Sequence, residues 1–282
     1  MELHDLLSGT RIFIRSELLM TIIREIWNYR SFIFGSIKRE FQLKYQNSML
    51  GIAWSVINPL AMIIVYTVIF QRVMHSRLPG VDNSFAYSIY LCSGILTWGL
   101  FLEITSRIQN VFIENANLVK KLAFPRIILP VIIVFSAVVN FTISFSLFIG
   151  FLLVSDSFPG WSFFSVFPVL LIQVIFSLGL GLTLGVLNVF FRDIGHLFGI
   201  VLQFWFWFTP IVYPITILPK ELHNLLILNP MAALVQAYQT IFVYGFCPPW
   251  QDLISPSLFA VVLSLLGFYL FRKYSGEMVD EL

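Results

Sequence analysis

Long uncharged stretches dominate the chain, and short charged segments separate them. Asp, Glu, Lys and Arg are all missing from seven stretches, which are Gly51–Gln71, Asn83–Leu102, Ile127–Ser155, Ser157–Phe191, Ile194–Pro219, Leu222–Gln251 and Leu253–Phe271. A helix needs about 20 apolar residues to cross the hydrocarbon layer of a bilayer, and most of these stretches reach that length. The pattern therefore predicts an integral membrane protein.

The uncharged stretches divide into six expected transmembrane helices and one broken segment. The helices are Ile52–Phe70, Phe85–Ile104, Ile127–Val154, Phe163–Phe190, Ile194–Tyr213 and Pro256–Phe271. The segment Pro214–Ser255 is also apolar, but Pro219, Pro230, Pro248 and Pro249 interrupt it. Proline removes a backbone donor, and an unsatisfied backbone group facing lipid is costly. We therefore expect an all-α membrane fold of six spans, with short re-entrant gate helices before the last one.

Composition and charge sharpen this picture and indicate an orientation. The 282 residues are 58% hydrophobic and 11% charged, whereas soluble domains average roughly 25% charged residues. If six helices cross the membrane, fourteen of the 17 Lys and Arg residues lie on the side of the termini. Positive residues accumulate on the cytoplasmic side, so both termini are predicted to be cytoplasmic. Two regions follow, an N-terminal segment over residues 1–50 and a transmembrane domain over 51–282.

The N-terminal segment contains one amphipathic pattern. Leu18–Phe34 has an apolar stripe and an opposite polar face carrying Arg24, Glu25, Asn28 and Ser31. This pattern predicts a helix that lies in the membrane interface. The alternative is a helix packed on the cytoplasmic side of the protein itself. The stripe consists of Leu19, Ile22, Ile23, Ile26 and Ile33.

The sequence contains none of the usual chemistry of membrane enzymes or ion-coupled carriers. Glu103 lies near the end of its predicted span, where an interfacial ion pair with Arg107 is favoured over a proton relay. No paired metal ligands, acid–base dyad or phosphate-binding loop occurs in the sequence. We therefore expect that this chain is not an enzyme and binds no metal. Energy for directed movement must come from another polypeptide.

The stretch QFWFWFTPIVYP, Gln203 to Pro214, concentrates large rings in front of two prolines. The rings could form an interfacial aromatic belt, pack against helices or lipid, or line a channel on which sugar rings slide. Phe204 and Phe208 are one turn apart and share a face, with Trp205 beside them and Trp207 pointing elsewhere. The candidate channel-lining residues are Trp54, Asn58, Tyr66, Phe204, Trp205, Trp207 and Phe208.

Three motifs together resemble a known family. They are KREFQLKYQNSMLGIAWSVINPL from Lys38, VFFRDIGHLFGIVLQFWFWFTPIVYP from Val189 and LNPMAALVQAYQ from Leu228. In this order they resemble ABC-2 type permeases, and more narrowly the membrane subunit of exporters of O-antigen, capsule and teichoic acid. The resemblance extends from about Arg11 to Phe271.

The resemblance implies a function and a set of partners. A homodimer of this subunit would carry two copies of an ABC ATPase and would export an undecaprenyl-pyrophosphate-linked polysaccharide across the bacterial inner membrane. ATP and Mg²⁺ would be bound by the ATPase, this chain would bind no cofactor, and nucleic acid would not be a partner. The alternatives are an ABC-2 permease for a small lipid or drug, teichoic acid export in a Gram-positive cell, and a membrane enzyme acting on polyprenyl-linked sugar.

The resemblance also assigns roles to the loops. The ATPase-coupling residues would be Lys38, Arg39, Glu40, Lys44 and Tyr45, and Glu114–Pro125 would form a cytoplasmic gate helix. Arg24, Arg30, Lys120, Lys121 and Arg126 would lie at this gate and attract a lipid pyrophosphate, or simply set the orientation of the chain. The outer gate would contain Pro210, Tyr213, Pro214, Asn229 and Pro230, although the prolines could equally just end a span.

Overall fold

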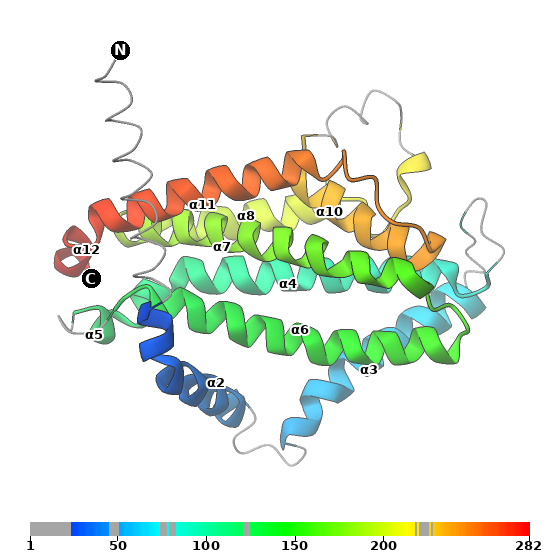
Figure 1. Cartoon of the computed structure of the whole chain (residues 1–282), viewed down its shortest axis with the longest axis horizontal. Coiled ribbons are helices and arrows are strands. Elements are labelled where there is room, and N and C mark those ends of the chain that lie inside the picture. Colours follow the sequence, from blue (N-terminus) through cyan, green and yellow to red (C-terminus); the bar gives the residue numbers. More distant parts are fainter. Residues whose placement is uncertain are drawn as a thin grey trace.

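In a computed structural model, every regular element among the described residues is helical (Figure 1). The structure describes residues 24–44, 51–73, 83–120, 125–217 and 228–282, together with residues 78, 219 and 226. The α-helices are α2 (Arg30–Lys44), α3 (Trp54–Thr67), α4 (Ala86–Glu114), α5 (Ala116–Val119), α6 (Ile128–Val154), α7 (Val166–Phe190), α8 (Asp193–Trp207), α10 (Pro230–Gln239), α11 (Ile254–Tyr274) and α12 (Glu277–Glu281). Short 3₁₀ segments are η1 (Gly51–Ala53), η3 (Gly160–Ser165) and η4 (Ile215–Ile217), and π-helical turns are η2 (Val68–Val73) and η5 (Thr240–Tyr244).

Four helical segments of the described chain are long and apolar enough to cross a membrane. They are Ala86–Glu114, Ile128–Val154, Gly160–Phe190 and Ile254–Tyr274. Each corresponds to a span expected from the sequence, so the all-helical membrane fold and four of its spans are confirmed. Of the other two expected spans, Trp54–Phe70 is a shorter apolar helix and α8 has 15 residues.

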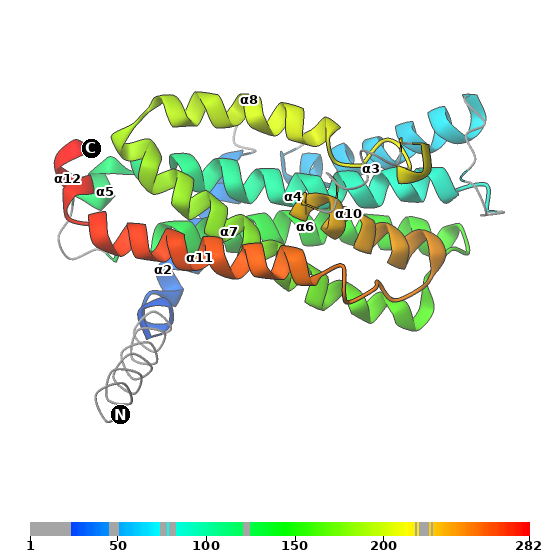
Figure 2. The same ribbon diagram turned by 90° about the horizontal axis from the view of Figure 1, so that it is seen from above.

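The long helices run side by side, and α4 is the central one. In Figure 2, α8 lies on one side of α4, whereas α7 and α11 lie on the other. The apolar part of α4 is 72% buried, but that of α11 is only 17% buried, so α11 is peripheral. Phe101, Ile104, Ile108 and Phe112 of α4 are completely buried. The helices α5 and α12 gather at the end of the bundle that also holds the start of α2, and α10 lies toward the opposite end (Figure 1).

Glycine permits the close packing of α7 against α11. A Cβ atom added to Gly179 would lie 2.5 Å from the backbone nitrogen of Ser264, which is too close for any side chain. A Cβ atom on Gly267 would lie 2.9 Å from the carbonyl oxygen of Gly179. The two helices therefore touch backbone to backbone, as small residues allow in membrane proteins.

Three expected helices have different boundaries in the structure. The helix expected to end at Ile104 continues to Glu114, because Glu103 and Arg107 pair with each other and so remain within α4. The gate helix expected over Glu114–Pro125 is reduced, within the described residues, to the single turn α5. The helix expected to reach Tyr213 ends at Trp207. Pro210 explains this end, because its ring clashes with the carbonyl of the residue four positions earlier and it has no N–H to donate.

The amphipathic N-terminal pattern is only partly within the described residues. Ile33 is buried against Ile127 and Ile128, and Ile26 packs on the same cluster. These two members of the apolar stripe thus contact the protein itself. Leu19, Ile22 and Ile23 lie outside the described residues. The membrane-surface position of this helix stays a prediction.

Candidate functional site

The aromatic run at the end of α8 separates into an outward and an inward group. Phe204, Trp207 and Phe208 are 62%, 63% and 68% exposed, whereas Trp205 and Phe206 are half-buried. Positions three and four apart share a helix face, so Trp207 joins Phe204 and Phe208. The expectation that Trp205 would lie beside them and Trp207 elsewhere was therefore wrong. The outward group forms a ring-covered end of α8.

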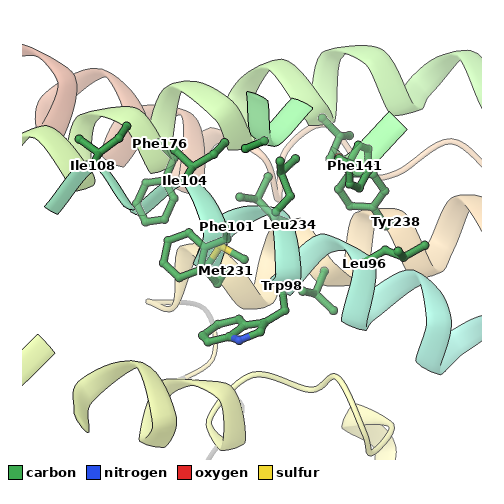
Figure 3. Packing of buried hydrophobic residues seen from close by; sticks show 14 of the residues in the cluster. Leu96, Trp98, Phe101, Ile104, Ile108, Phe141, Phe176, Met231, Leu234 and Tyr238 are labelled. Atoms are coloured by element: carbon green, nitrogen blue, oxygen red, sulfur yellow. The ribbon is translucent and has the colours of Figure 1, made fainter. Parts of the chain in front are cut away.

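Trp205 is held in the interior by ring contacts and one hydrogen bond. Its ring centroid lies 5.3 Å from that of Phe101 and 6.4 Å from those of Trp98 and Phe176. Figure 3 shows Trp98 extending from α4 toward the ribbon of α8. The Trp205 indole N–H donates to Oδ1 of Asn229 at 2.8 Å. These contacts anchor α8 on α4.

Asn229 joins the end of α8 to the start of α10. Its Oδ1 also accepts from the backbone nitrogens of Met231 and Ala232, which makes Asn229 the N-cap of α10, followed by Pro230 as the first helical residue. Its Nδ2 donates to the carbonyl of Phe208 at 3.2 Å and to the Thr209 hydroxyl at 3.2 Å. A single amide thus joins the end of α8 to the start of α10.

The chain between Phe208 and Pro214 is irregular, yet side chains bind its carbonyls. The Tyr90 hydroxyl donates to the carbonyls of Pro210 at 3.0 Å and Tyr213 at 2.9 Å, and the Tyr87 hydroxyl donates to Val212 at 2.7 Å. The amide of Gln239 in α10 also donates to the Pro210 carbonyl, at 3.1 Å. Irregular backbone within a membrane is tolerated only where protein groups satisfy it. Tyr213 itself donates its hydroxyl hydrogen to the Trp207 carbonyl at 2.6 Å.

Reasoning from the sequence missed Tyr87, Tyr90 and Gln239. A glutamine inside an apolar stretch is a signal that could have been noticed, because a buried amide needs partners. Asn188, a second buried amide within an apolar stretch, was also missed. It donates to the Gln109 carbonyl at 3.1 Å and accepts from the Gly195 nitrogen at 2.9 Å, so it joins α4, α7 and the start of α8. For the two tyrosines the sequence offers no such signal.

The candidates on α3 lie on an open surface. Trp54 and Asn58 are exposed and one turn apart, so they share a face of the helix. Tyr66 is half-buried, with its ring centroid 6.3 Å from that of Phe70. In Figure 2, α3 and α8 both lie on the same side of α4. We refer to the exposed faces of these two helices together as the α3–α8 face.

The charged candidates lie near the other end of the bundle. Some of them are exposed, and others form ion pairs. Lys38 and Arg39 on α2 are exposed, and Glu40 accepts an ion pair from Arg107 with 2.8 Å between Nη2 and Oε1. Arg107 also lies 3.3 Å from Glu103, so the ion pair expected between these two is confirmed. Lys44 is the last residue of α2, and Tyr45 lies outside the described residues.

The residues expected to contact a lipid headgroup also differ: some are exposed, and others donate hydrogen bonds within the protein. Arg24 and Lys120 are exposed, and Arg30 donates to the carbonyl of Trp27 at 3.0 Å while lying over its ring. Arg126 donates to the carbonyl of Val119 and to the hydroxyl and carbonyl of Ser275, and thereby fastens the C-terminal segment. Lys121 lies outside the described residues. Within the part of the chain that the structure describes, no group of three His, Cys, Asp or Glu side chains could hold a metal ion.

These long apolar helices, with a polar end and, at the other end, an irregular turn whose carbonyls are bound by side chains, define an all-α multi-pass membrane protein. The chain belongs to the ABC-2 type transporter family, which matches residues 32–243. It is 28% identical over 266 residues to the O-antigen export system permease protein RfbA of Myxococcus xanthus, covering 94% of this chain and 100% of that protein.

Two further relatives show the same kind of coverage. An O-antigen export system permease protein RfbA of Klebsiella pneumoniae is 30% identical over 246 residues, which are 86% of this chain and 92% of that protein. The polysialic acid transport protein KpsM of Escherichia coli is 22% identical over 248 residues, 86% of this chain and 93% of that protein. The resemblance to ABC-2 type permeases of polysaccharide export is thereby confirmed.

Proposed function

We propose that this chain is the membrane-spanning permease subunit of an ATP-driven exporter that moves lipid-linked, O-antigen-like polysaccharide from the cytoplasm to the periplasm. The single observation that carries the proposal is the match to O-antigen export permeases over nearly the whole of both chains. A deletion strain tests it. We expect surface polysaccharide to disappear and lipid-linked polymer to accumulate inside, and the plasmid-borne gene to restore export.

The assembly we propose is a homodimer with two ABC ATPase subunits. The α3–α8 face supports the dimer, since it presents apolar side chains such as Ile64 and Val65 of α3 and Ile200 and Val201 of α8 to the outside. An exposed apolar face of this extent fits a partner or lipid. ATP and Mg²⁺ would be bound by the ATPase, which supplies the energy. Co-purification of tagged and untagged copies, with and without the ATPase, tests both contacts.

Coupling to the ATPase would run through α2. Lys38 and Arg39 are exposed; Lys38 is available to an acidic partner surface, whereas Arg39 also borders a cleft between α2, α4 and α6. Glu40 is already paired with Arg107, so it would transmit movement of α2 to α4 rather than contact the ATPase. Lys44 and Tyr45 complete the proposed coupling segment.

The polysaccharide path would follow the α3–α8 face. The path would be lined by the exposed rings of Phe204, Trp207 and Phe208 on α8 and by the exposed Trp54 and Asn58 on α3, and the ring faces would contact sugar C–H surfaces without fixed hydrogen bonds. Weak contacts of this kind release each sugar unit as the next arrives. Trp205 would serve as the anchor of the lining helix, and Tyr66, half-buried beside Phe70, would border the path.

The turn after α8 would form the outer gate. Its carbonyls depend on Tyr87, Tyr90, Gln239 and Asn229, so a small shift of α4 or α10 changes the whole turn. Pro210, Tyr213, Pro214 and Pro230 restrict its backbone. Because helix-breaking residues concentrate here, motion at this end does not require unwinding of the long spans.

We further propose six spans in the bacterial inner membrane, with both termini in the cytoplasm. The Lys and Arg distribution supports this orientation, and α3 and α8 would be the two shorter spans. The exposed Trp27 and Phe34 support contact of the N-terminal helices with the membrane interface. The undecaprenyl pyrophosphate would approach the exposed Arg24, Arg30 and Lys120, and Lys121, which follows Lys120 in the sequence, whereas Arg126 is occupied by Ser275.

A further inference from the structure

A cleft separate from the α3–α8 face lies between α2, α4, α5 and α6. Its volume is about 660 Å³. Small-molecule sites in proteins span about 300–1,000 Å³, so the cleft has room for a lipid headgroup and the first part of its chains. Its lining combines charged residues of α2 and α4 with apolar residues of α6. The proposed sugar path does not use it.

An ion-pair network forms one wall of the cleft. Arg107 is shared by Glu40 of α2, at 2.8 Å, and Glu103 of α4, at 3.3 Å. Asn140 of α6 donates to the same oxygen of Glu103 at 2.7 Å. The Arg107, Glu40 and Glu103 side chains are each about one third exposed, so they face the cleft rather than the core. One guanidinium therefore serves two carboxylates, and this wall is negative by one charge.

Two further charged residues of the lining are available to a ligand. Arg39 of α2 and Glu114 of α4 border the cleft, and no ion pair joins either of them to another residue in the described part of the chain. The lining thus contains three carboxylates and two guanidinium groups. A purely anionic headgroup would meet net repulsion here. A headgroup that carries both a phosphate and a cation would match Arg39 and Glu114 together.

The remainder of the lining is apolar and extends into a span. Ile132 and Ile133 lie just after the first turn of α6, and Val111 faces them from α4. The cleft therefore crosses the level at which the apolar span begins. A ligand that fits must be amphiphilic, with its charged part near Glu114 and its chain along α6.

We propose that this cleft binds a zwitterionic aminophospholipid, with the phosphate facing Arg39 and the primary ammonium facing Glu114. A primary ammonium donates up to three hydrogen bonds, which a quaternary choline cannot. The unpaired carboxylate selects against anionic lipids. Binding of this lipid would hold α2 against α4 and α6 beside the Glu40–Arg107 pair. The inference requires only a membrane protein with this cleft, and it does not depend on what the protein exports.

Lipid retention by the purified full-length protein tests the proposal. The protein is placed in nanodiscs with equal amounts of phosphatidylethanolamine and phosphatidylglycerol of identical chains, and the lipids retained after mild delipidation are measured by native mass spectrometry. We expect phosphatidylethanolamine to be preferred about fivefold, the ratio that one partly exposed ion pair of about 1 kcal/mol produces. Phosphatidylcholine in its place should show a smaller preference.

Three variants separate the contributions of the two charges. Glu114→Gln should reduce the preference to near one, Glu114→Lys should reverse it toward phosphatidylglycerol, and Arg39→Gln should reduce retention of both lipids. Lys38→Gln is the matched control, since Lys38 is next to Arg39 in sequence but does not line the cleft. An absence of preference in the unmodified protein, or a full preference in Glu114→Gln, would overturn the proposal.

Discussion

The indole N–H of Trp205 and the amide oxygen of Asn229 lie 2.8 Å apart and join the aromatic end of α8 to the first turn of α10. The same oxygen caps α10, and the amide nitrogen binds the Phe208 carbonyl. One side chain therefore satisfies polar groups at the end of α8 and at the start of α10. The order of this end of the helix bundle depends on this contact.

Loss of the Asn229 side chain should destabilise the protein more than its size suggests. Asn229→Ala removes a helix cap and leaves the Trp205 N–H without an acceptor, a combined cost of about 2–3 kcal/mol. Thermal unfolding in detergent measures the loss. Asn229→Asp keeps an acceptor for both groups and should lose clearly less. An equal loss in the two variants would contradict the role assigned to the oxygen.

Tyr90 should matter through its hydroxyl alone. Tyr90→Phe removes the donor to the Pro210 and Tyr213 carbonyls, which should cost about 1–3 kcal/mol and accelerate amide hydrogen exchange around Thr209 and Ile211. Tyr238→Phe is the matched control, because the buried Tyr238 hydroxyl has no hydrogen-bond partner among the described residues. Similar exchange rates in both variants would show that the hydrogen bonds from Tyr90 to these carbonyls do not stabilise the turn.

The contact between α7 and α11 should not accept a side chain at Gly179. Gly179→Ala places a Cβ atom against the backbone of Ser264, and the helices must separate, at a cost of about 1–3 kcal/mol. Gly150→Ala in α6 is the control, since an added Cβ there meets nothing within 4 Å. It should be neutral or stabilising by up to about 1 kcal/mol. The thermal unfolding midpoints of the two variants test this prediction, and equal midpoints would contradict it.

The outward rings of α8 should support export without supporting the fold. Phe204→Ala and Trp207→Ala should reduce surface polysaccharide several-fold while the unfolding midpoint stays near that of the unmodified protein, because these rings are largely exposed. Phe135→Ala and Trp161→Ala remove rings that are also exposed, by 50% and 88%, from other helical segments and serve as controls. Undiminished polymer in the α8 variants at normal expression would count against the sugar path.

Charge reversal on α2 should weaken ATPase attachment. Lys38→Glu replaces an exposed positive charge that we place against the ATPase, and less ATPase should co-purify with the tagged permease; Arg39 is kept because it borders the cleft beside α2. Lys120→Glu is an equally exposed control outside α2. Unchanged co-purification in Lys38→Glu would remove Lys38 from the proposed coupling segment.

The positions of the long helices could be predicted, but the end of α8 could not. Ile127–Val154 was expected and Ile128–Val154 is observed, because a long apolar stretch forms a helix wherever lipid or protein surrounds it. Trp205 and Trp207, two residues apart, have opposite environments. The order of the rings along the chain does not say which of them faces α4.

The ion pairs of Arg107 show the same difference between contacts that the sequence predicts and contacts that it does not. The pair of Glu103 and Arg107 was predictable, since four residues separate them on one helix. The pair of Glu40 and Arg107 was not, because 67 positions separate them and only the placement of α2 beside α4 brings them together.

By itself, the sequence determined that this protein is helical, crosses a membrane and resembles polysaccharide export permeases. Membrane insertion depends on the local composition of about 20 consecutive residues, which can be read directly. The tertiary structure alone decided which ring of the aromatic run anchors α8, which carbonyls Tyr90 and Asn229 satisfy, and that Arg107 joins α2 to α4. Each of these contacts depends on the packing of helices that are distant in the sequence, and no local pattern encodes that packing.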